Sequence, residues 1–444
     1  MTSAPLIRVK HDLPPTPPLP ASLQTLVCRW RPLALFDWCR RRIGDRFTLY
    51  CLDLPPVVFL SNPTDIRAVL TAPASVLRPG AGGSAIAPIV GAHSFMLHDA
   101  DEHMRGRRTI LPCFSASAME EHAHRVARVV QSEIASWPLD TPFSAFPRLR
   151  SMSLRIILET VFQVEARRLS RLHHYMLRML AVTDSFVLVE PRLRHLPPWR
   201  GIWRRFLHER ARVDAEILSV IEQAPTSSND VLDRLRAATN HDGSPLSFAQ
   251  LRDNLVSVML AGHETTASEA TWALQLIAHS PLAQARLTEE LDEGSTDRYL
   301  QATVAEVLRH RPVFVFAIPR VVAAPFELGG WIFEPPVQLL ACMYLLHHDP
   351  TLYPRPDEFL PERFLTRTPE PHAWLPWGGG RKRCPGHRLA TLELEGVIRA
   401  TLAERTLSPA SRRVERAQWR SVIVTPVNGG RVILSARRSS RHIR

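Results

Sequence analysis

The chain has 444 residues, 45% of them apolar, which is enough for a folded protein with a sizeable core. The net charge of +12 would suit a nucleic-acid partner, but the basic residues are spread along the chain without a DNA- or RNA-binding motif, so we expect none. Six scattered cysteines without a Cys-x-x-Cys pair argue against a structural zinc site and favour a reducing compartment.

The amino-terminal segment, residues 1–20, is rich in proline and has no long apolar run. Neither a secretory signal nor a membrane anchor fits such a segment. No repeat or long low-complexity linker divides the chain after it. We therefore expect one catalytic domain over residues 21–436 and a basic tail over residues 437–444.

The first predicted elements are short. A helix is expected over residues 33–42, followed by a pair of strands over residues 47–52 and 57–60. Asn62 is a candidate N-cap, because its side chain can accept from a free backbone N–H of a helix over residues 64–70.

Residues from about 70 to 320 give a mostly helical signal. One buried helix face follows the i, i+3, i+4, i+7 spacing of Leu154, Ile157, Leu158 and Val161. Short β-like stretches return near residues 320–326, 337–341 and 422–434. The pattern predicts a mainly α protein with a small β region in a single large domain.

The strongest predicted helix follows Pro245. Ser247 and Gln250 have the spacing of a capping box at its start, and Pro281 stops it after about Ser280. At 1.5 Å per residue this rod is roughly 50 Å long. A helix of that length must cross most of a domain.

The middle of this helix, residues 261–266, reads Ala-Gly-His-Glu-Thr-Thr. His263 and Glu264 would begin a His-Glu-x-x-His zinc motif, but the second histidine is missing, so that interpretation fails. Gly262 costs the helix about 1 kcal/mol relative to alanine, which a flat ligand against the helix would explain. Glu264 and Thr265 suit proton transfer; the alternative is that Thr265 bonds its i−4 carbonyl and Glu264 is solvated.

A lone cysteine, Cys384, lies in a loop that reads Trp-Gly-Gly-Gly-Arg-Lys-Arg-Cys-Pro-Gly over residues 377–386. Glycines allow close backbone approach and positive φ, while cations lower the pKa of a thiol and pair with carboxylates. The loop is therefore suited to hold a thiolate against a flat, anionic group. Pro385 is expected in the first turn of a following helix, whose positive end would face the sulfur.

Both motifs resemble those of the cytochrome P450 family. The loop is similar to the heme signature Phe-x-x-Gly-x-(Arg or His)-x-Cys-x-Gly, with Trp377 for the phenylalanine and Lys382 for the arginine or histidine. The helix resembles the oxygen-activation motif Ala-Gly-x-(Asp or Glu)-Thr-(Thr or Ser). The resemblance implies that Cys384 is the metal ligand, that Thr265 hydrogen-bonds oxygen and that Glu264 relays protons. It also implies heme contacts by Trp377, Gly378, Gly386, Ala261 and Gly262.

Cations for the two heme propionates are expected from several segments. His103 and Arg107, four residues apart on one helix face, resemble the family's His-x-x-x-Arg helix. Arg320 lies where a strand of the family supplies another propionate ligand, and Lys382 is a further candidate. The alternatives are a solvated surface charge for each arginine and a satisfied core histidine for His103.

Glu306 and Arg309 resemble the family's Glu-x-x-Arg segment, and Arg363 lies in a segment similar to its Pro-Glu-Arg-Phe. An ordinary i, i+3 ion pair on a helix contributes only about 0.2–0.5 kcal/mol and is common on surfaces. The resemblance instead implies one buried ion cluster of these three residues, which supports the heme side of the fold.

The substrate pocket has the weakest sequence signal, because each of its candidate residues could equally be plain core. By resemblance, the loop over residues 76–96 lines it, and residues 186–201 form a lid rich in proline and arginine. The lid composition favours an apolar or anionic small molecule. The further candidates are Val258, Phe316, Ala317, Thr425 and Val427.

The resemblance covers nearly the whole chain beyond residue 20 and implies the family's triangular, mostly helical prism with heme b between the long helix and the Cys384 loop. It identifies a soluble, cytoplasmic, bacterial-type heme-thiolate monooxygenase without a membrane anchor, expected to be a monomer. Such an enzyme activates O2 with two external electrons and hydroxylates or epoxidises a small, largely apolar organic substrate.

The electrons must come from another protein, because the chain has no Gly-x-Gly-x-x-Gly fingerprint and no spare cysteine cluster for iron and sulfur. An acidic ferredoxin with an NAD(P)H-dependent reductase is the expected donor, docking on the basic face around residues 381–383. One alternative is a peroxide-using or rearranging heme-thiolate enzyme, against which Glu264 and Thr265 argue. Another is a non-catalytic heme-binding sensor.

Overall fold

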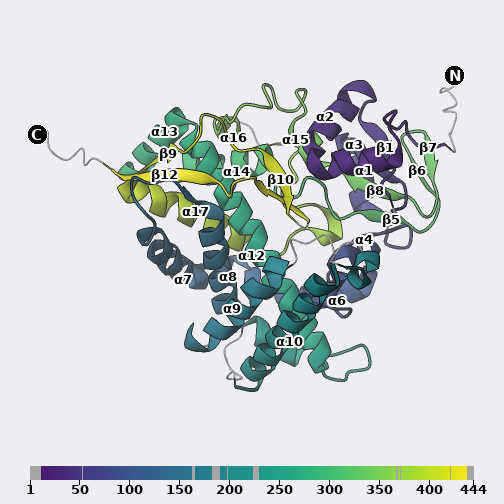
Figure 1. Ribbon diagram of the computed structural model, residues 1–444, viewed down its shortest axis with the longest axis horizontal. Helices are drawn as coiled ribbons and strands as arrows, with labels where there is room; N and C mark the ends of the chain where they lie inside the picture. The colour runs from purple at the N-terminus through teal and green to yellow at the C-terminus, as the bar shows by residue number, and fades with distance from the viewer. Residues whose placement is uncertain are drawn as a thin grey trace, which may run out of the picture.

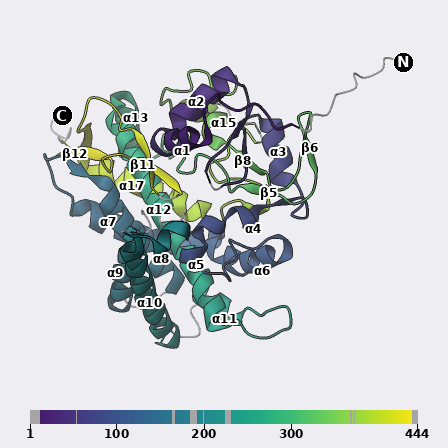
Figure 2. The same cartoon turned by 45° about the vertical axis from the view of Figure 1, so that its right-hand side comes forward.

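The computed structural model describes residues 12–52, 54–162, 166–182, 191–197, 199–223, 230–366, 369–370, 372–420 and 422–437. Figures 1 and 2 show the amino-terminal helices and the largest sheet on one side of the molecule. Helices α7, α8, α9 and α17 gather on the other side, and α12 runs between the two. The mainly α fold with a small β region is confirmed as a single domain.

The described helices vary from single turns to one rod of 31 residues. The α-helices are α1 (Ala21–Trp30), α2 (Pro32–Arg42), α3 (Pro63–Thr71), α4 (Pro79–Gly82), α5 (Ala87–Val90), α6 (Ala100–Ile110), α7 (Ala116–Ala135), α8 (Ala145–Phe162), α9 (Ala166–Val182), α10 (Trp199–Gln223), α11 (Val231–Ala237), α12 (Phe248–Ala278), α13 (Pro281–Glu293), α14 (Arg298–His310), α15 (Met343–His347), α16 (Arg363–Thr366) and α17 (His387–Glu404). The 3-10 helices are η1 (Ser84–Ile86), η2 (Leu111–Phe114), η4 (Pro191–His195) and η5 (Gly380–Lys382).

The strands are short and form small sheets. A five-stranded sheet has the order β1-β2-β8-β5-β3, in which only the β2–β8 pair is parallel. A three-stranded sheet has the order β4-β12-β9, and β6-β7 and β10-β11 are two-stranded. The bounds are β1 (Arg46–Leu49), β2 (Val57–Leu60), β3 (Leu77–Arg78), β4 (Phe143–Ser144), β5 (Arg320–Val322), β6 (Phe326–Leu328), β7 (Trp331–Phe333), β8 (Gln338–Ala341), β9 (Arg405–Pro409), β10 (Ala417–Arg420), β11 (Ile423–Pro426) and β12 (Arg431–Ala436).

Helix α12 organises the fold. Its capping box is confirmed: the Gln250 backbone N–H donates to the Ser247 side chain at 3.3 Å, and the Gln250 side chain accepts from the Ser247 N–H at 2.8 Å. The helix ends at Ala278, two residues earlier than predicted. It packs against α8, α17, α14 and β11, so the largest core cluster forms around it.

Several predicted boundaries were wrong. Helix α1 was not predicted. Strand β1 ends at Leu49, whereas the predicted strand ran to residue 52. The predicted stretches 320–326 and 422–434 are each divided, because turns separate β5 from β6 and β11 from β12. The N-cap of α3 is confirmed, since the Thr64 N–H donates to Asn62 Oδ1 at 2.9 Å.

Candidate active site

Cys384 lies between η5 and α17, and its side chain is half-buried. Its backbone N–H donates to the Trp377 carbonyl oxygen at 2.9 Å, which closes the loop. The Trp377 ring is partly buried, with its centroid 6.2 Å from that of His387. Because α17 begins at His387, Pro385 lies before the helix, and its predicted place in the first turn was wrong.

Glycine is needed in the Cys384 loop for two different structural reasons. Gly380 has φ +63, and a Cβ there would lie 2.1 Å from the Leu70 carbonyl oxygen, so packing against α3 requires it. Gly378 also has positive φ, at +64, but no atom lies within 4 Å of its Cβ position. The Cβ position of Gly386 is equally open. The open space at Gly378 and Gly386 is what a flat group beside the loop needs.

Helix α12 has a gap in its burial. Its residues are buried from Leu251 to Ala278 except for four in the middle of the helix, Leu260, Ala261, Gly262 and Thr265. Ala261 is exposed although it lies in the middle of α12, the longest helix among the described residues. A small exposed residue at such a place leaves room for a group that is not protein.

Gly262 faces a neighbouring helix. A Cβ on Gly262 would lie 2.9 Å from Ile157 Cδ1 of α8, and the Ser153 hydroxyl donates to the Gly262 carbonyl oxygen at 3.0 Å. The sequence interpretation explained this glycine by a flat ligand. The structure gives another reason: α8 approaches α12 too closely for a side chain.

Glu264 and Thr265 point in different directions. The Thr265 hydroxyl donates to the Ala261 carbonyl oxygen at 2.6 Å, which is the i−4 contact of the alternative interpretation. Glu264 is buried rather than solvated, and its Oε1 lies 3.7 Å from Arg150 Nε of α8 and 3.9 Å from Arg420 Nε of β10. Consecutive residues of a helix are about 100° apart, so acid and alcohol do not share a face.

His263 is a packing residue. Its side chain is fully buried, and burial, Arg150, His173 and Arg420 lower its pKa well below the ordinary value. Within the described ranges, neither ring nitrogen has a hydrogen-bond partner. Across the same ranges, no three or more His, Cys, Asp or Glu side chains gather as a metal site.

The predicted propionate cations gather around the Cys384 loop: Arg107 and Arg320 both act electrostatically on Lys382, and Arg107 acts also on Cys384. His103 is buried on α6, and Arg107 is half-buried one turn further along the same helix. Arg320 of β5 is 4% exposed, and its guanidinium donates to the Ile318 carbonyl oxygen. Burial lowers the pKa of Arg320 to about 10 and also lowers that of Arg107. In the part of the chain that is described, neither arginine has a carboxylate within ion-pair distance.

Lys382 has other acceptors than those predicted. Its Nζ donates to the carbonyl oxygens of Met96 at 3.0 Å and His98 at 2.7 Å, and lies 3.1 Å from His103 Nδ1. The two carbonyl oxygens accept two of the three protons of the ammonium group. Burial lowers the pKa of Lys382 to about 8. The lysine ties the Cys384 loop to the segment before α6, and propionate binding by it stays a prediction.

Glu306, Arg309 and Arg363 meet in the interior. Arg309 donates from Nε to Glu306 Oε2 at 2.7 Å and from Nη2 to Oε1 at 2.8 Å, with both side chains 0% exposed. Arg363 Nε donates to Glu306 Oε1 at 3.2 Å. The remaining Arg309 donors reach the carbonyl oxygens of His347 and Pro356, each at 2.9 Å, and that of Glu358 at 3.2 Å. Helix α14 is thereby joined to the segment that precedes the Cys384 loop.

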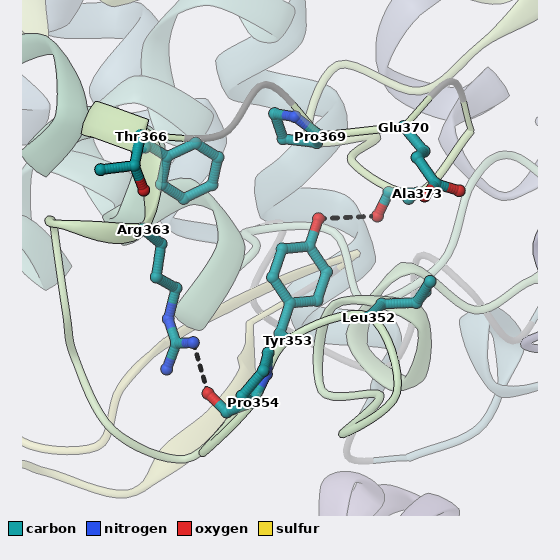
Figure 3. A pocket seen from close by; sticks show the side chains of 9 residues that line it. Leu352, Tyr353, Pro354, Arg363, Thr366, Pro369, Glu370 and Ala373 are labelled. Carbon is teal, nitrogen blue, oxygen red and sulfur yellow. Dashed lines mark hydrogen bonds between the residues drawn. The ribbon is translucent and has the colours of Figure 1, made fainter.

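A pocket of about 220 Å³ lies next to this cluster. Figure 3 shows Tyr353 in this pocket with its hydroxyl directed toward Ala373, and the hydroxyl donates to the Ala373 carbonyl oxygen at 2.9 Å. Arg363, which donates to the Pro354 carbonyl oxygen, is its only lining residue among those predicted for the site. None of the predicted heme or substrate residues lines it, so we assign the chemistry to the α12 gap instead.

The predicted substrate residues lie mostly in the core. Val258, Ala317 and Thr425 are buried, Phe316 and Val427 only partly so. The Phe316 ring lies 5.7 Å from that of Trp419, and the Val427 N–H donates to the Arg416 carbonyl oxygen at 2.9 Å. The loop 76–96 contains β3, α4, η1 and α5. Of the predicted lid, residues 186–190 and 198 lie outside the described residues.

Sequence reasoning missed Glu393 of α17. The carboxyl is buried, which raises its pKa to about 8, and it hydrogen-bonds Ser153. Ser153 in turn donates to the Gly262 carbonyl oxygen, so three helices meet through a neutral acid. Glu393 lies on α17, the helix that begins three residues after Cys384, so this contact joins the element that follows the cysteine loop to α12 through Ser153. No sequence pattern marks such a contact between helices.

The residues present fit a flat group with a metal centre and two carboxylates. One half-buried thiol stands just before α17, and α12 leaves a gap at Ala261 and Thr265. Two arginines, Arg107 and Arg320, have no carboxylate within ion-pair distance among the described residues. Two buried or half-buried cations without counter-ions are costly unless an anion joins them.

None of the helices in the described part of the chain has the length and apolar character that a membrane span requires.

Comparisons with known proteins point to one family. A sequence model of the family described as Cytochrome P450 matches residues 13–434. The chain is 32% identical over 435 residues to putative cytochrome P450 135B1 of Mycobacterium tuberculosis (strain ATCC 25618 / H37Rv), covering 96% of this chain and 92% of that one. It is 32% identical over 451 residues to putative cytochrome P450 138 of the same strain, covering 98% and 99%.

Solved structures show the same fold. Retinoic acid-bound cyanobacterial CYP120A1 superposes with a TM-score of 0.84 at 21% identity, over 96% of this chain and all of that chain. The heme domain of cytochrome P450DA superposes with a TM-score of 0.82 at 19% identity, over 96% and 98%. At such identities the likeness concerns the fold.

Proposed function

Because the chain belongs to the cytochrome P450 family, we propose that it hydroxylates or epoxidises a small, largely apolar organic molecule, with Cys384 as the ligand of its heme. Family membership makes it an oxidoreductase of the monooxygenase class that uses heme b and O2, so a non-catalytic sensor is set aside. The observation that carries the proposal is a half-buried thiol near two arginines that have no carboxylate within ion-pair distance in the described part of the chain.

Residues from three segments, the Cys384 loop, α6 and β5, would hold heme. Cys384 binds the iron as a thiolate, since a metal-bound thiol is deprotonated outright. Arg107 and Arg320 pair with the propionates, and His103 positions the loop through the contact of its Nε2 with the Arg381 carbonyl oxygen at 3.2 Å. When bound, heme supplies the redox chemistry that activates oxygen, and the thiolate favours oxygen–oxygen cleavage.

Thr265 and Glu264 have separate tasks in this proposal. Thr265 borders the α12 gap, so its hydroxyl holds and passes a proton there once it leaves the Ala261 carbonyl oxygen. Glu264 is held by Arg150 and Arg420 and reaches the gap only if its side chain turns or water intervenes. The pair argues for oxygen-driven rather than peroxide-driven chemistry.

Replacing Thr265 with alanine is expected to lower product formed per NAD(P)H consumed by about 10²-fold, because general acid–base groups contribute about that much or more. Oxygen consumption should continue, with the reduced oxygen appearing as peroxide. Thr265→Ser keeps the hydroxyl and is expected to restore most of the product. Product yield per NAD(P)H, measured by chromatography, checks this prediction. An unchanged yield in the alanine variant would show that Thr265 has no role in proton transfer.

The electron donor is proposed to be an acidic ferredoxin that docks near the Cys384 loop. Exposed arginines lie in this loop, at the start of α17 and on α6, whose His103 contacts the Arg381 carbonyl oxygen; across the described chain none of these arginines has a carboxylate within ion-pair distance. They are Arg105, Arg108, Arg381, Arg383 and Arg388. Opposite charge steers two proteins together and is weakened by salt.

Electron transfer from such a ferredoxin is expected to slow several-fold between about 0.05 and about 0.3 M salt. Arg383→Glu should slow it similarly at low salt. Arg412→Glu is the matched control, because neighbouring Ser411 contacts His279 at the far end of α12, about 21 Å along the helix from Thr265. Stopped-flow reduction kinetics check this; salt-independent rates would exclude electrostatic docking.

A further inference from the structure

Cys28 and Cys51 lie against each other although they belong to different elements. Cys28 is in α1, Cys51 follows β1, and a side-chain hydrogen bond joins the two thiols. Both side chains are only partly buried and neither is in a disulfide. Neither residue belongs to the candidate active site.

Backbone contacts on both sides of Cys51 hold the pair in place. The Tyr50 N–H donates to Gln24 Oε1 at 2.9 Å, and the Leu52 N–H donates to Thr25 Oγ1 at 2.9 Å. Cys28 lies one turn after Gln24 and Thr25 on α1, so the same helix face presents all three side chains to this segment. The contact is thus built by the fold around it.

The two thiols are not equivalent. Cys28 donates its proton toward Cys51, which lowers the pKa of the Cys51 thiol. The same hydrogen bond, burial and the neighbouring Cys51 raise the pKa of Cys28. A thiolate is the nucleophile in thiol oxidation, so Cys51 is the attacking sulfur and Cys28 the partner that keeps its proton.

The other cysteines provide a contrast within the same chain. Cys39, Cys113 and Cys342 are buried, and burial raises the pKa of Cys39 and Cys342 to about 12 and that of Cys113 to about 11. Such thiols stay protonated and out of reach of solutes at neutral pH. Cys384 is the proposed heme ligand and is therefore not free in the holoenzyme.

We propose that Cys28 and Cys51 form an oxidation site, at which hydrogen peroxide converts the two thiols into an intrachain disulfide. The Cys51 thiolate attacks one peroxide oxygen, the oxygen–oxygen bond breaks, and Cys51 becomes a sulfenic acid while the other oxygen leaves as water. The Cys28 thiol then attacks the sulfenic sulfur and releases a second water. Two thiols lose two electrons and two protons, and one peroxide gains them.

The disulfide would fasten α1 to the end of β1 and close the chain over residues 29–50. The Cys28 carbonyl oxygen accepts from Trp419 Nε1 at 3.0 Å, and the Trp419 ring lies 5.7 Å from Phe316. Oxidation therefore restrains α1, which contacts Trp419, and Trp419 in turn packs against Phe316, one of the predicted substrate residues. A thiol reductant would reverse the change.

The test treats the reduced holoenzyme, without substrate or electron donor, with a few equivalents of hydrogen peroxide. Free thiols are then alkylated and the peptides are mapped by mass spectrometry. The expected product is a Cys28–Cys51 linked peptide that is lighter by two hydrogen atoms, formed at least about 10-fold faster than any modification of the buried cysteines. Equal or slower oxidation of Cys28 and Cys51 overturns the proposal.

Variants separate the two roles. Cys28→Ala is expected to leave Cys51 as a sulfenic acid that dimedone traps, whereas Cys51→Ala should leave Cys28 reduced. Saturating imidazole, which occupies the heme iron, should not change the linkage; its loss would show that heme rather than the thiols reacts with peroxide, and would also overturn the proposal. Because the wild-type measurement needs no variant, a folding defect in either variant leaves the test intact.

Discussion

Serine in place of Cys384 is expected to abolish the red-shifted absorption band of the reduced carbon monoxide complex, together with turnover. A serine hydroxyl does not ionise at neutral pH, so the iron loses the thiolate that donates electron density to it. Product formation should fall by at least about 100-fold, more than the loss of an outer-shell partner of a metal site costs. Difference spectra of the reduced protein with carbon monoxide check this directly.

Cys51→Ser is the matched control for this experiment, because Cys51 is also half-buried and lies outside the candidate active site. It should keep the red-shifted band and the turnover of the wild type. If the band survives in Cys384→Ser, or disappears in the control alone, Cys384 is not the heme ligand. Heme content, measured by the pyridine hemochrome, separates loss of the ligand from loss of heme.

Arg309→Ala is expected to destabilise the fold by about 3–5 kcal/mol, because it leaves the Glu306 carboxylate buried without its main partner. Both side chains are 0% exposed, and Arg309 supplies two of the hydrogen bonds to that carboxylate. Arg363 and the Leu360 N–H, which donates at 2.9 Å, remain but do not restore the lost charge contact. A lower urea midpoint and reduced heme content should both result.

Glu358→Gln is the control, because it removes an i, i+3 ion pair of the same kind that lies at the surface. Glu358 forms an i, i+3 pair with Arg355 at 3.0 Å, and the two side chains are 53% and 67% exposed. An exposed pair contributes about 0–1 kcal/mol, so this variant should unfold near the wild-type urea midpoint. Equal urea midpoints for Arg309→Ala and Glu358→Gln would mean that burial does not determine how much the ion cluster contributes to the free energy of unfolding.

Local signals in the sequence were reliable where the chain itself makes the contact. The capping box of Ser247 and Gln250 and the N-cap Asn62 involve residues two or three apart, so their spacing alone predicts the hydrogen bond. Boundaries were less certain: α12 stops at Ala278, and Pro385 lies before α17. Helix ends depend on caps and packing as much as on proline.

The direction in which a side chain points could not be predicted from the sequence. Adjacent positions suggested that Glu264 and Thr265 act together, yet Glu264 turns toward Arg150 and Arg420, which come from distant elements. Gly262 was read as room for a ligand, but Ile157 occupies the space beside it. Both outcomes depend on how α8 and β10 pack against α12.

The sequence by itself determined the family motifs, the long helix and the mainly α fold class, because these depend on residue type and short spacing. Only the tertiary structure decided which groups meet: Lys382 with the carbonyl oxygens of Met96 and His98, Glu393 with Ser153, and Cys28 with Cys51. These partners are separated by many residues, and a contact between distant segments follows from the packing of whole elements rather than from any local pattern.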